Sequence, residues 1–153
     1  MKSKLHFLQR TFIAKLRSID PATAPLWGKM NVQQMIEHMS DSVRIANGKD
    51  LQTVITPAER LQAMKDFAVS EKEFRPNTKN ALMGEHPAEV RLKDTEAAIL
   101  ELETEMRLFV EHFEQNAGST VANPFFGELN FQEWISLLYK HAVHHLKQFG
   151  IEV

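Results

Sequence analysis

The sequence contains no cysteine among its 153 residues. This absence excludes disulfide bonds, thiolate metal ligands and a cysteine nucleophile, so any thiol chemistry has to come from a separate molecule. An excess of charge of one sign is also lacking, because 18 Lys and Arg residues stand against 20 Asp and Glu residues, for a formal net charge of −2. We therefore expect neither a nucleic acid nor an anionic membrane surface as a partner.

Long apolar runs are missing as well. No stretch approaches the roughly 20 apolar residues that a membrane span requires. The segment 1–17 is positively charged, but polar residues interrupt its apolar ones, unlike the core of a secretory signal. These absences favour a soluble cytoplasmic protein. The length of 153 residues, with 43% of them hydrophobic, suits a single domain over residues 1–153.

Apolar residues recur at helical spacing along most of the chain, whereas no stretch shows the sustained alternation of a strand. The pattern predicts main helices over about 4–17, from Asn31 to Asn47, over about 94–115 and from Asn130 to Gly150, with a short helix from Pro57 to Phe67. The segment 49–91 is otherwise irregular. The predicted fold class is therefore all-α, a four-helix bundle with a long crossover connection between the second and third main helices, and such bundles build metal sites in their cores.

The last predicted helix carries two histidines, His141 and His145, which lie only about 40° apart on a helical wheel. A pair of neutral imidazoles at this spacing can hold one ion, and imidazole suits Zn, Ni, Cu or Fe(II). His145 falls at the edge of the apolar stripe, whereas the adjacent His144 faces outward, toward solvent or a dimer partner. Gln148 follows in the direction of the pair, and we expect it to orient a ring or a bound water by a hydrogen bond.

A third ligand has to come from another helix, because the pair alone is a weak signal. His38 is the best candidate, since it flanks the apolar stripe of the second predicted helix; the alternative is a partly exposed helix histidine. Its neighbours Glu37 and Asp41 are either solvated acids or hydrogen-bond acceptors close to the site, with Asp41 retained as a candidate general base. The remaining histidines are expected at the surface, namely His6, His86 and His112.

Three motifs together resemble a known family: Trp27-Gly28-Lys29-Met30-Asn31-Val32-Gln33-Gln34-Met35-Ile36-Glu37-His38, Asn123-Pro124-Phe125-Phe126-Gly127, and Tyr139-Lys140-His141-Ala142-Val143-His144-His145-Leu146-Lys147-Gln148-Phe149-Gly150. With them the sequence resembles the DinB-like superfamily of metal-dependent helical bundles, in a branch of unknown function. The resemblance covers most of the chain apart from the middle connector. It implies a divalent transition metal (Zn, Ni or Fe) held by one histidine of the second helix and two of the last, that is by His38, His141 and His145.

The resemblance also implies a function. Three protein ligands leave coordination positions open for water or substrate, as in catalytic sites. Better-known relatives are transferases and isomerases that use a low-molecular-weight thiol, whose pKa a metal can lower. We therefore expect a homodimeric metal-dependent enzyme, a transferase or hydrolase, with a small-molecule substrate. The alternative is a non-catalytic helical bundle that serves metal binding or protein interaction.

Overall fold

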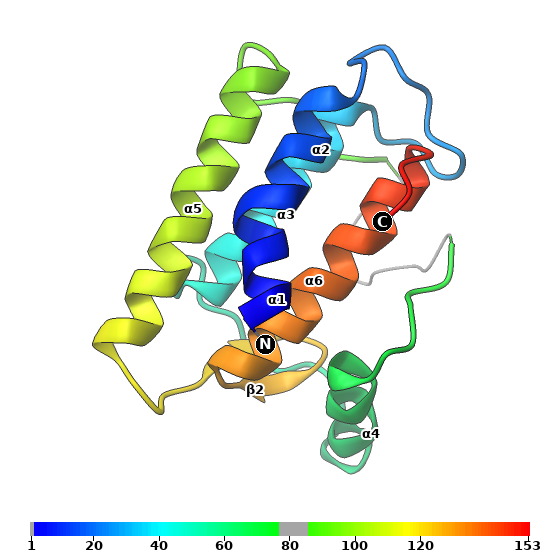
Figure 1. Ribbon diagram of the computed structural model, residues 1–153. Coiled ribbons are helices and arrows are strands. Elements are labelled where there is room, and N and C mark those ends of the chain that lie inside the picture. Colours follow the sequence, from blue (N-terminus) through cyan, green and yellow to red (C-terminus); the bar gives the residue numbers. More distant parts are fainter. Residues whose placement is uncertain (1, 77–85) are drawn as a thin grey trace.

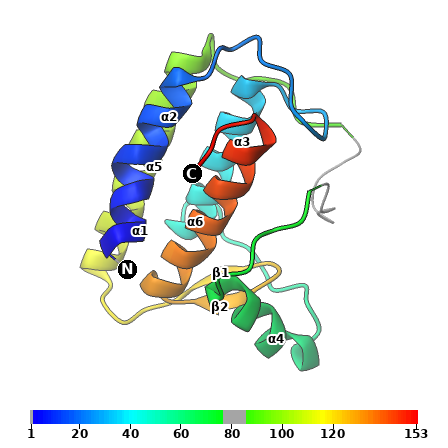
Figure 2. The ribbon, with the colours of Figure 1, turned by 45° about the vertical axis from the view of Figure 1, so that its right-hand side comes forward.

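The computed structural model describes residues 2–76 and 86–153, and four helical rods make up its frame (Figures 1 and 2). The first rod consists of α1 (Lys2–His6), the π-helical turn η1 (Phe7–Thr11) and α2 (Phe12–Ser18), which follow one another directly. The other rods are α3 (Val32–Ala46), α5 (Thr95–Gln115) and α6 (Phe131–Gln148). α3 packs against α5 and α6, and the first rod closes the bundle against the same two helices. The predicted fold class, an all-α four-helix bundle, is confirmed.

Both helices that carry candidate ligands begin after an asparagine that acts as the N-cap. The Asn31 side chain accepts a hydrogen bond from the backbone N–H of Gln34 at 2.8 Å, and the Gln34 side chain accepts one from the Asn31 N–H, also at 2.8 Å. Asn130 and Glu133 repeat this reciprocal pair at the start of α6, at 2.9 Å in both directions. Such a capping box satisfies two backbone donors that the helix itself cannot. The start of each helix, and so the position of its histidines, is thereby fixed.

The core lies between the rods and is almost entirely apolar. Side chains from all four rods are fully buried there, among them Phe12, Leu16, Met35, Met39, Leu102, Phe109, Trp134 and Leu138. Burying one such side chain contributes about 1.5–3 kcal/mol relative to leaving it in water. The polar edge of Trp134 is satisfied as well, because its Nε1 donates to the Val121 carbonyl at 3.0 Å. The rods that position the candidate site are therefore held by close apolar packing.

The connection between α3 and α5 contains the short helix α4 (Ala58–Val69), which lies outside the four-rod frame at the lower right of Figure 1. It packs against α6. The sequence predicted this helix and the long crossover around it, and the structure confirms both. The helix ends at Val69, two residues beyond the predicted Phe67.

A small hairpin precedes α6, and the sequence pattern did not predict it. β1 (Val121–Asn123) pairs in antiparallel register with β2 (Gly127–Leu129), so that Val121 faces Leu129. The Asn123 side chain closes the turn by accepting hydrogen bonds from the backbone N–H groups of Phe125 and Phe126, at 2.8 and 3.0 Å. Strands of three residues are too short to show the alternation from which strands are recognised in a sequence.

Candidate metal centre

Three histidine rings meet between α3 and α6. Nε2 of His141 lies 3.0 Å from Nε2 of His38 and 2.9 Å from Nε2 of His145. One nitrogen from each ring lies within 4.8 Å of the other two. Two nitrogens that share an ion at bond lengths of about 2.0–2.1 Å can be at most about 4.2 Å apart, and both Nε2 separations satisfy this limit. The structure thus brings together the three histidines that the sequence singled out.

Hydrogen bonds between the rings cannot satisfy all three nitrogens. Nδ1 of His145 lies 2.8 Å from Oε1 of Gln148, an atom that only accepts, so Nδ1 carries the proton and Nε2 of neutral His145 presents a lone pair. If Nε2 of His141 carries a proton and donates it to His145, the same nitrogen cannot accept a hydrogen bond from His38. If Nε2 of His141 instead accepts from His38, its lone pair faces the lone pair of His145 Nε2 at 2.9 Å. A cation between the rings resolves this conflict, so the residues present fit a bound metal ion.

All three rings have pKa values below the usual value for histidine. Burial lowers the pKa of His141 and His145 well below 6.5, and the neighbouring histidines lower both further. Burial also lowers the pKa of His38, although the negative charge of Asp41 works in the opposite direction. Because desolvation disfavours the charged imidazolium, the rings are neutral at neutral pH. Neutral imidazole is the form that binds a metal.

The residues expected around the ligands have different surroundings. Gln148 is buried and bonded to His145, as described above. The Asp41 side chain is 55% exposed and pairs with Arg44 and Arg91. It influences His38 through its charge, and its carboxylate is committed to the two arginines.

Glu37 is buried, and its carboxylate holds the segment that leads into α5. It accepts hydrogen bonds from the backbone N–H groups of Arg91, at 2.8 Å, and Leu92, at 3.3 Å. The residue is only 4% exposed, so the sequence-based alternative of a solvated acid is wrong for Glu37. Its role is to fix the end of the crossover connection against α3, one residue before His38.

His144 is half-buried, so it is less exposed than predicted, and its contact with a dimer partner stays a prediction. Its ring centroid lies 5.4 Å from that of Trp27 and 5.9 Å from that of Phe74. Phe74 also stands edge-on to His141, with centroids 6.3 Å apart. The aromatic ring of Phe74 therefore covers the α6 side of the site.

The segment 70–74 that carries Phe74 follows α4 and is held to α6 by a stripe of polar side chains. The Lys140 amine is buried, donates to the carbonyls of Ser70, at 3.0 Å, and Lys72, and lies over the Phe67 ring. Lys147 forms an ion pair with Glu73. This role of Lys140 was not predicted from the sequence. The sequence did contain a signal for a second contact face on this helix, because Lys140, His144 and Lys147 recur at helical spacing. Their stripe runs beside the one formed by His141, His145 and Gln148.

A pocket of about 300 Å³ opens beside His38. It lies between α3 and the start of the described segment 86–91, and its lining includes His38, Asp41, His86 and Arg91. His86 is exposed there, as predicted, and His6 is exposed on α1. His112 is half-buried: a Cβ added at Gly48 would meet its ring at 3.4 Å. The pocket therefore lies on the His38 side of the cluster, and neither His141 nor His145 contributes to its lining.

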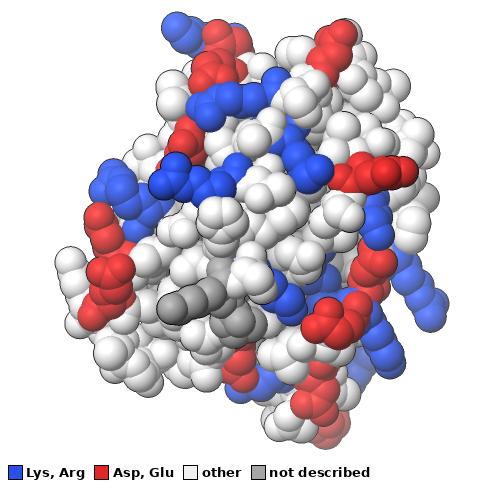
Figure 3. All heavy atoms as spheres, in the orientation of Figure 1, with Lys and Arg blue, Asp and Glu red and all other residues white. Residues whose placement is uncertain are grey.

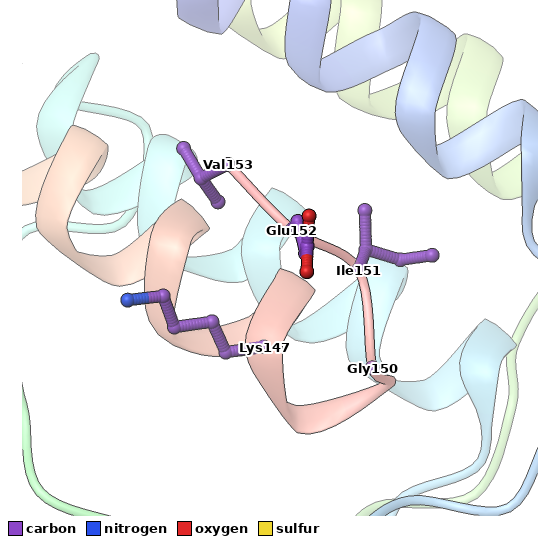
Figure 4. A pocket seen from close by; sticks show the side chains of 5 residues that line it. All are labelled: Lys147, Gly150, Ile151, Glu152 and Val153. Carbon is purple, nitrogen blue, oxygen red and sulfur yellow. The ribbon is translucent and has the colours of Figure 1, made fainter.

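A second pocket, of about 420 Å³, lies at the C-terminal end of α6 (Figure 4). Its lining consists of Lys147, Gly150, Ile151, Glu152 and Val153, and no histidine of the cluster contributes to it. This pocket is a surface depression away from the candidate ligands.

The surface seen in Figure 3 carries basic and acidic side chains interspersed with one another. Ion pairs between such side chains occur at the protein surface, for example that of Arg17 with Glu96 and Glu103. Among the described residues, every helix is too short or too polar to cross a bilayer.

The fold and the site together define the class: a helical bundle with a three-histidine cluster between two of its helices. The chain belongs to the family described as "Protein of unknown function (DUF1569)", which matches residues 5–151. Among solved structures it is similar to the crystal structure of TT2238, a four-helix bundle protein, with 22% sequence identity, a TM-score of 0.52, and coverage of 95% of this chain and 92% of that one. At this identity the likeness shows the fold alone. No curated protein matches the chain.

Proposed function

We propose that this protein binds one divalent transition-metal ion through Nε2 of His38, His141 and His145, and that it is a metal-dependent enzyme of the DinB-like type. The observation that carries the proposal is the convergence of three neutral rings whose nitrogens cannot all be satisfied by hydrogen bonds among themselves. When bound, an ion with three protein ligands keeps open positions and can lower the pKa of a thiol or water held there.

The chain's own residues would supply binding and shielding. Gln148 fixes the orientation of the His145 ring, and Phe74 covers His141 from the side of α6. The pocket beside His38 offers a route for a small-molecule substrate. Because the chain has no cysteine, a thiol substrate would be an external, low-molecular-weight one.

One observation favours the alternative, a metal-binding bundle without catalysis. The acids closest to His38 are engaged in structural contacts: Glu37 holds the backbone at Arg91 and Leu92, and Asp41 pairs with two arginines. A general base has to be free to take a proton within hydrogen-bond reach of the substrate. In this alternative the same three histidines hold the ion, and the pocket admits only solvent.

Metal analysis of tag-free protein tests the proposal. After growth in medium supplemented with Zn, Ni and Fe, we expect about one ion per chain in the wild type and a loss of binding in His145→Ala. His112→Ala is the control, because His112 lies outside the cluster. Wild-type protein without a stoichiometric metal, or a His145→Ala variant that retains it, contradicts the proposal.

Thermal shifts with low-molecular-weight thiols then separate the two functions. A ligand that binds only the native state raises its stability, so the enzyme function predicts a shift for metal-loaded wild type with at least one thiol of a panel. The shift should disappear in His145→Ala. A metal-loaded protein that responds to none of the thiols favours the non-catalytic alternative.

A further inference from the structure

The turn before α3 contacts Gln148, the hydrogen-bond partner of His145. The backbone N–H of Leu26 donates to the Gln148 carbonyl at 2.7 Å, and Nε2 of Gln148 donates to the Trp27 carbonyl at 3.0 Å. The Trp27 ring packs beside His144, with centroids 5.4 Å apart, which fixes the turn against α6. Gln148 is thus hydrogen-bonded to the turn through both its backbone carbonyl and its side-chain amide, and the residue is 4% exposed.

We infer that the Trp27–Gly28 turn selects the tautomer of His145: it orients the Gln148 amide and thereby places the ring proton on Nδ1. Trp27 and Gly28 are then positioning residues for a ring that they do not touch. This role was not apparent from the sequence, in which Trp27 and Gly28 stand about 120 positions before Gln148.

The direction of each hydrogen bond follows from the chemistry of the groups. A backbone carbonyl only accepts, so the NH₂ end of the Gln148 amide has to face Trp27. The oxygen end then faces His145 and can only accept, so Nδ1 of His145 has to carry the proton. The lone pair of neutral His145 is therefore at Nε2, the atom that lies 2.9 Å from Nε2 of His141.

Gly28 is needed because the turn approaches the amide closely. A Cβ added at Gly28 would lie 3.0 Å from Nε2 of Gln148, which is tighter than an ordinary contact, so the amide would have to shift by a few tenths of an ångström from the place where it bonds to the Trp27 carbonyl. Gly28 has a φ of +75°, in the left-handed region. Gly150 has nearly the same φ, +76°, but a Cβ there would meet nothing within 4 Å. The two glycines therefore share the left-handed φ and differ in their contact with Gln148.

The matched pair gives a sharp test. Gly28→Asn and Gly150→Asn introduce the same side chain at nearly the same φ, and asparagine tolerates this conformation better than other residues with a Cβ. Imidazole ¹⁵N NMR of the metal-free protein at neutral pH reports which nitrogen of His145 carries the proton. We expect Nδ1–H in the wild type and in Gly150→Asn. In Gly28→Asn and in Gln148→Leu we expect a mixture of tautomers.

A second readout rests on the proposed function. Loss of such an orienting partner typically weakens metal binding about 10–100-fold, so Gly28→Asn and Gln148→Leu should both raise the Kd for Zn²⁺ while Gly150→Asn leaves it unchanged. The two failures are distinguishable, because the tautomer is measured without metal. A wild type that binds no Zn²⁺ overturns the proposed function alone. An Nε2–H tautomer in the wild type, or a pure Nδ1–H tautomer in Gly28→Asn, overturns the inference alone.

Discussion

The stability of the metal-free protein should depend on pH through the buried histidines. Burial holds the pKa of His141 and His145 well below 6.5 in the native state, whereas the unfolded chain exposes both rings. As the pH falls below about 6.5, the unfolded chain takes up protons and the native protein does not. Stability is therefore fully present above this pH and decreases as the pH falls toward the lower native pKa values.

The size of the effect follows from the number of rings. Each ring that is protonated only in the unfolded state costs about 1.4 kcal/mol per pH unit. His141 and His145 together should reduce the free energy of unfolding by about 2–3 kcal/mol between pH 6 and pH 5. This loss is large compared with the total of about 5–15 kcal/mol that is typical of small proteins. The window lies above the usual carboxyl pKa of about 4, so most acids contribute little to the change.

Urea unfolding in the presence of a chelator, repeated from about pH 7 to pH 5, measures the effect. His141→Leu should reduce the pH dependence by about a third to a half, because one of the two strongly shifted rings is removed while His145 and His38, whose pKa is also lowered, remain. His86→Gln is the control, since His86 is exposed and lies outside the cluster, and its pH dependence should equal that of the wild type. A wild-type free energy of unfolding that is constant over this range would falsify the description of His141 and His145 as rings that stay neutral in the native state.

Three further substitutions test individual contacts. The Ser40 hydroxyl is fully buried and has no hydrogen-bond partner among the described residues. Ser40→Ala should therefore raise the free energy of unfolding, measured in urea, by about 1 kcal/mol. A clear decrease would show that the hydroxyl does have a hydrogen-bond partner. Lys140→Met keeps an apolar side chain of similar length but removes the amine, and with it the contact over the Phe67 ring and the bonds to Ser70 and Lys72. It should cost about 1–3 kcal/mol in the same assay and speed hydrogen exchange at the end of α4, whereas unchanged exchange would contradict the contact. Phe74→Ala uncovers His141, so a chelator should extract Zn²⁺ faster than from the wild type; an equal rate would mean that Phe74 does not shield the site.

The sequence predicted the parts of this structure that depend on local chemistry. Asn31 and Asn130 were recognised as helix starts because an asparagine side chain satisfies the free N–H groups of a first turn. His141 and His145 were paired because residues four apart share a face of a helix. These relations involve neighbours along one helix, so a single sequence is sufficient to recognise them.

Long-range contacts were less accessible to the same reasoning. His38 meets His141 across 103 positions, and helical periodicity alone does not specify which helices become neighbours; the family resemblance supplied that pairing. Asp41 was considered as a base, but it pairs with Arg91 from the irregular crossover, whose path no pattern predicts. The burial of His144 and Lys140 was missed for the same reason, since both are covered by the segment that follows α4.

X-ray absorption spectroscopy at the zinc edge, on protein loaded with one equivalent of Zn²⁺, is the most direct test of the three-histidine centre. We expect about three imidazole ligands with Zn–N distances of about 2.0–2.1 Å, and fewer in His38→Ala. His112→Ala should give the spectrum of the wild type. A wild-type spectrum without imidazole scattering, or one that His38→Ala leaves unchanged, would contradict the claim that His38, His141 and His145 hold the metal.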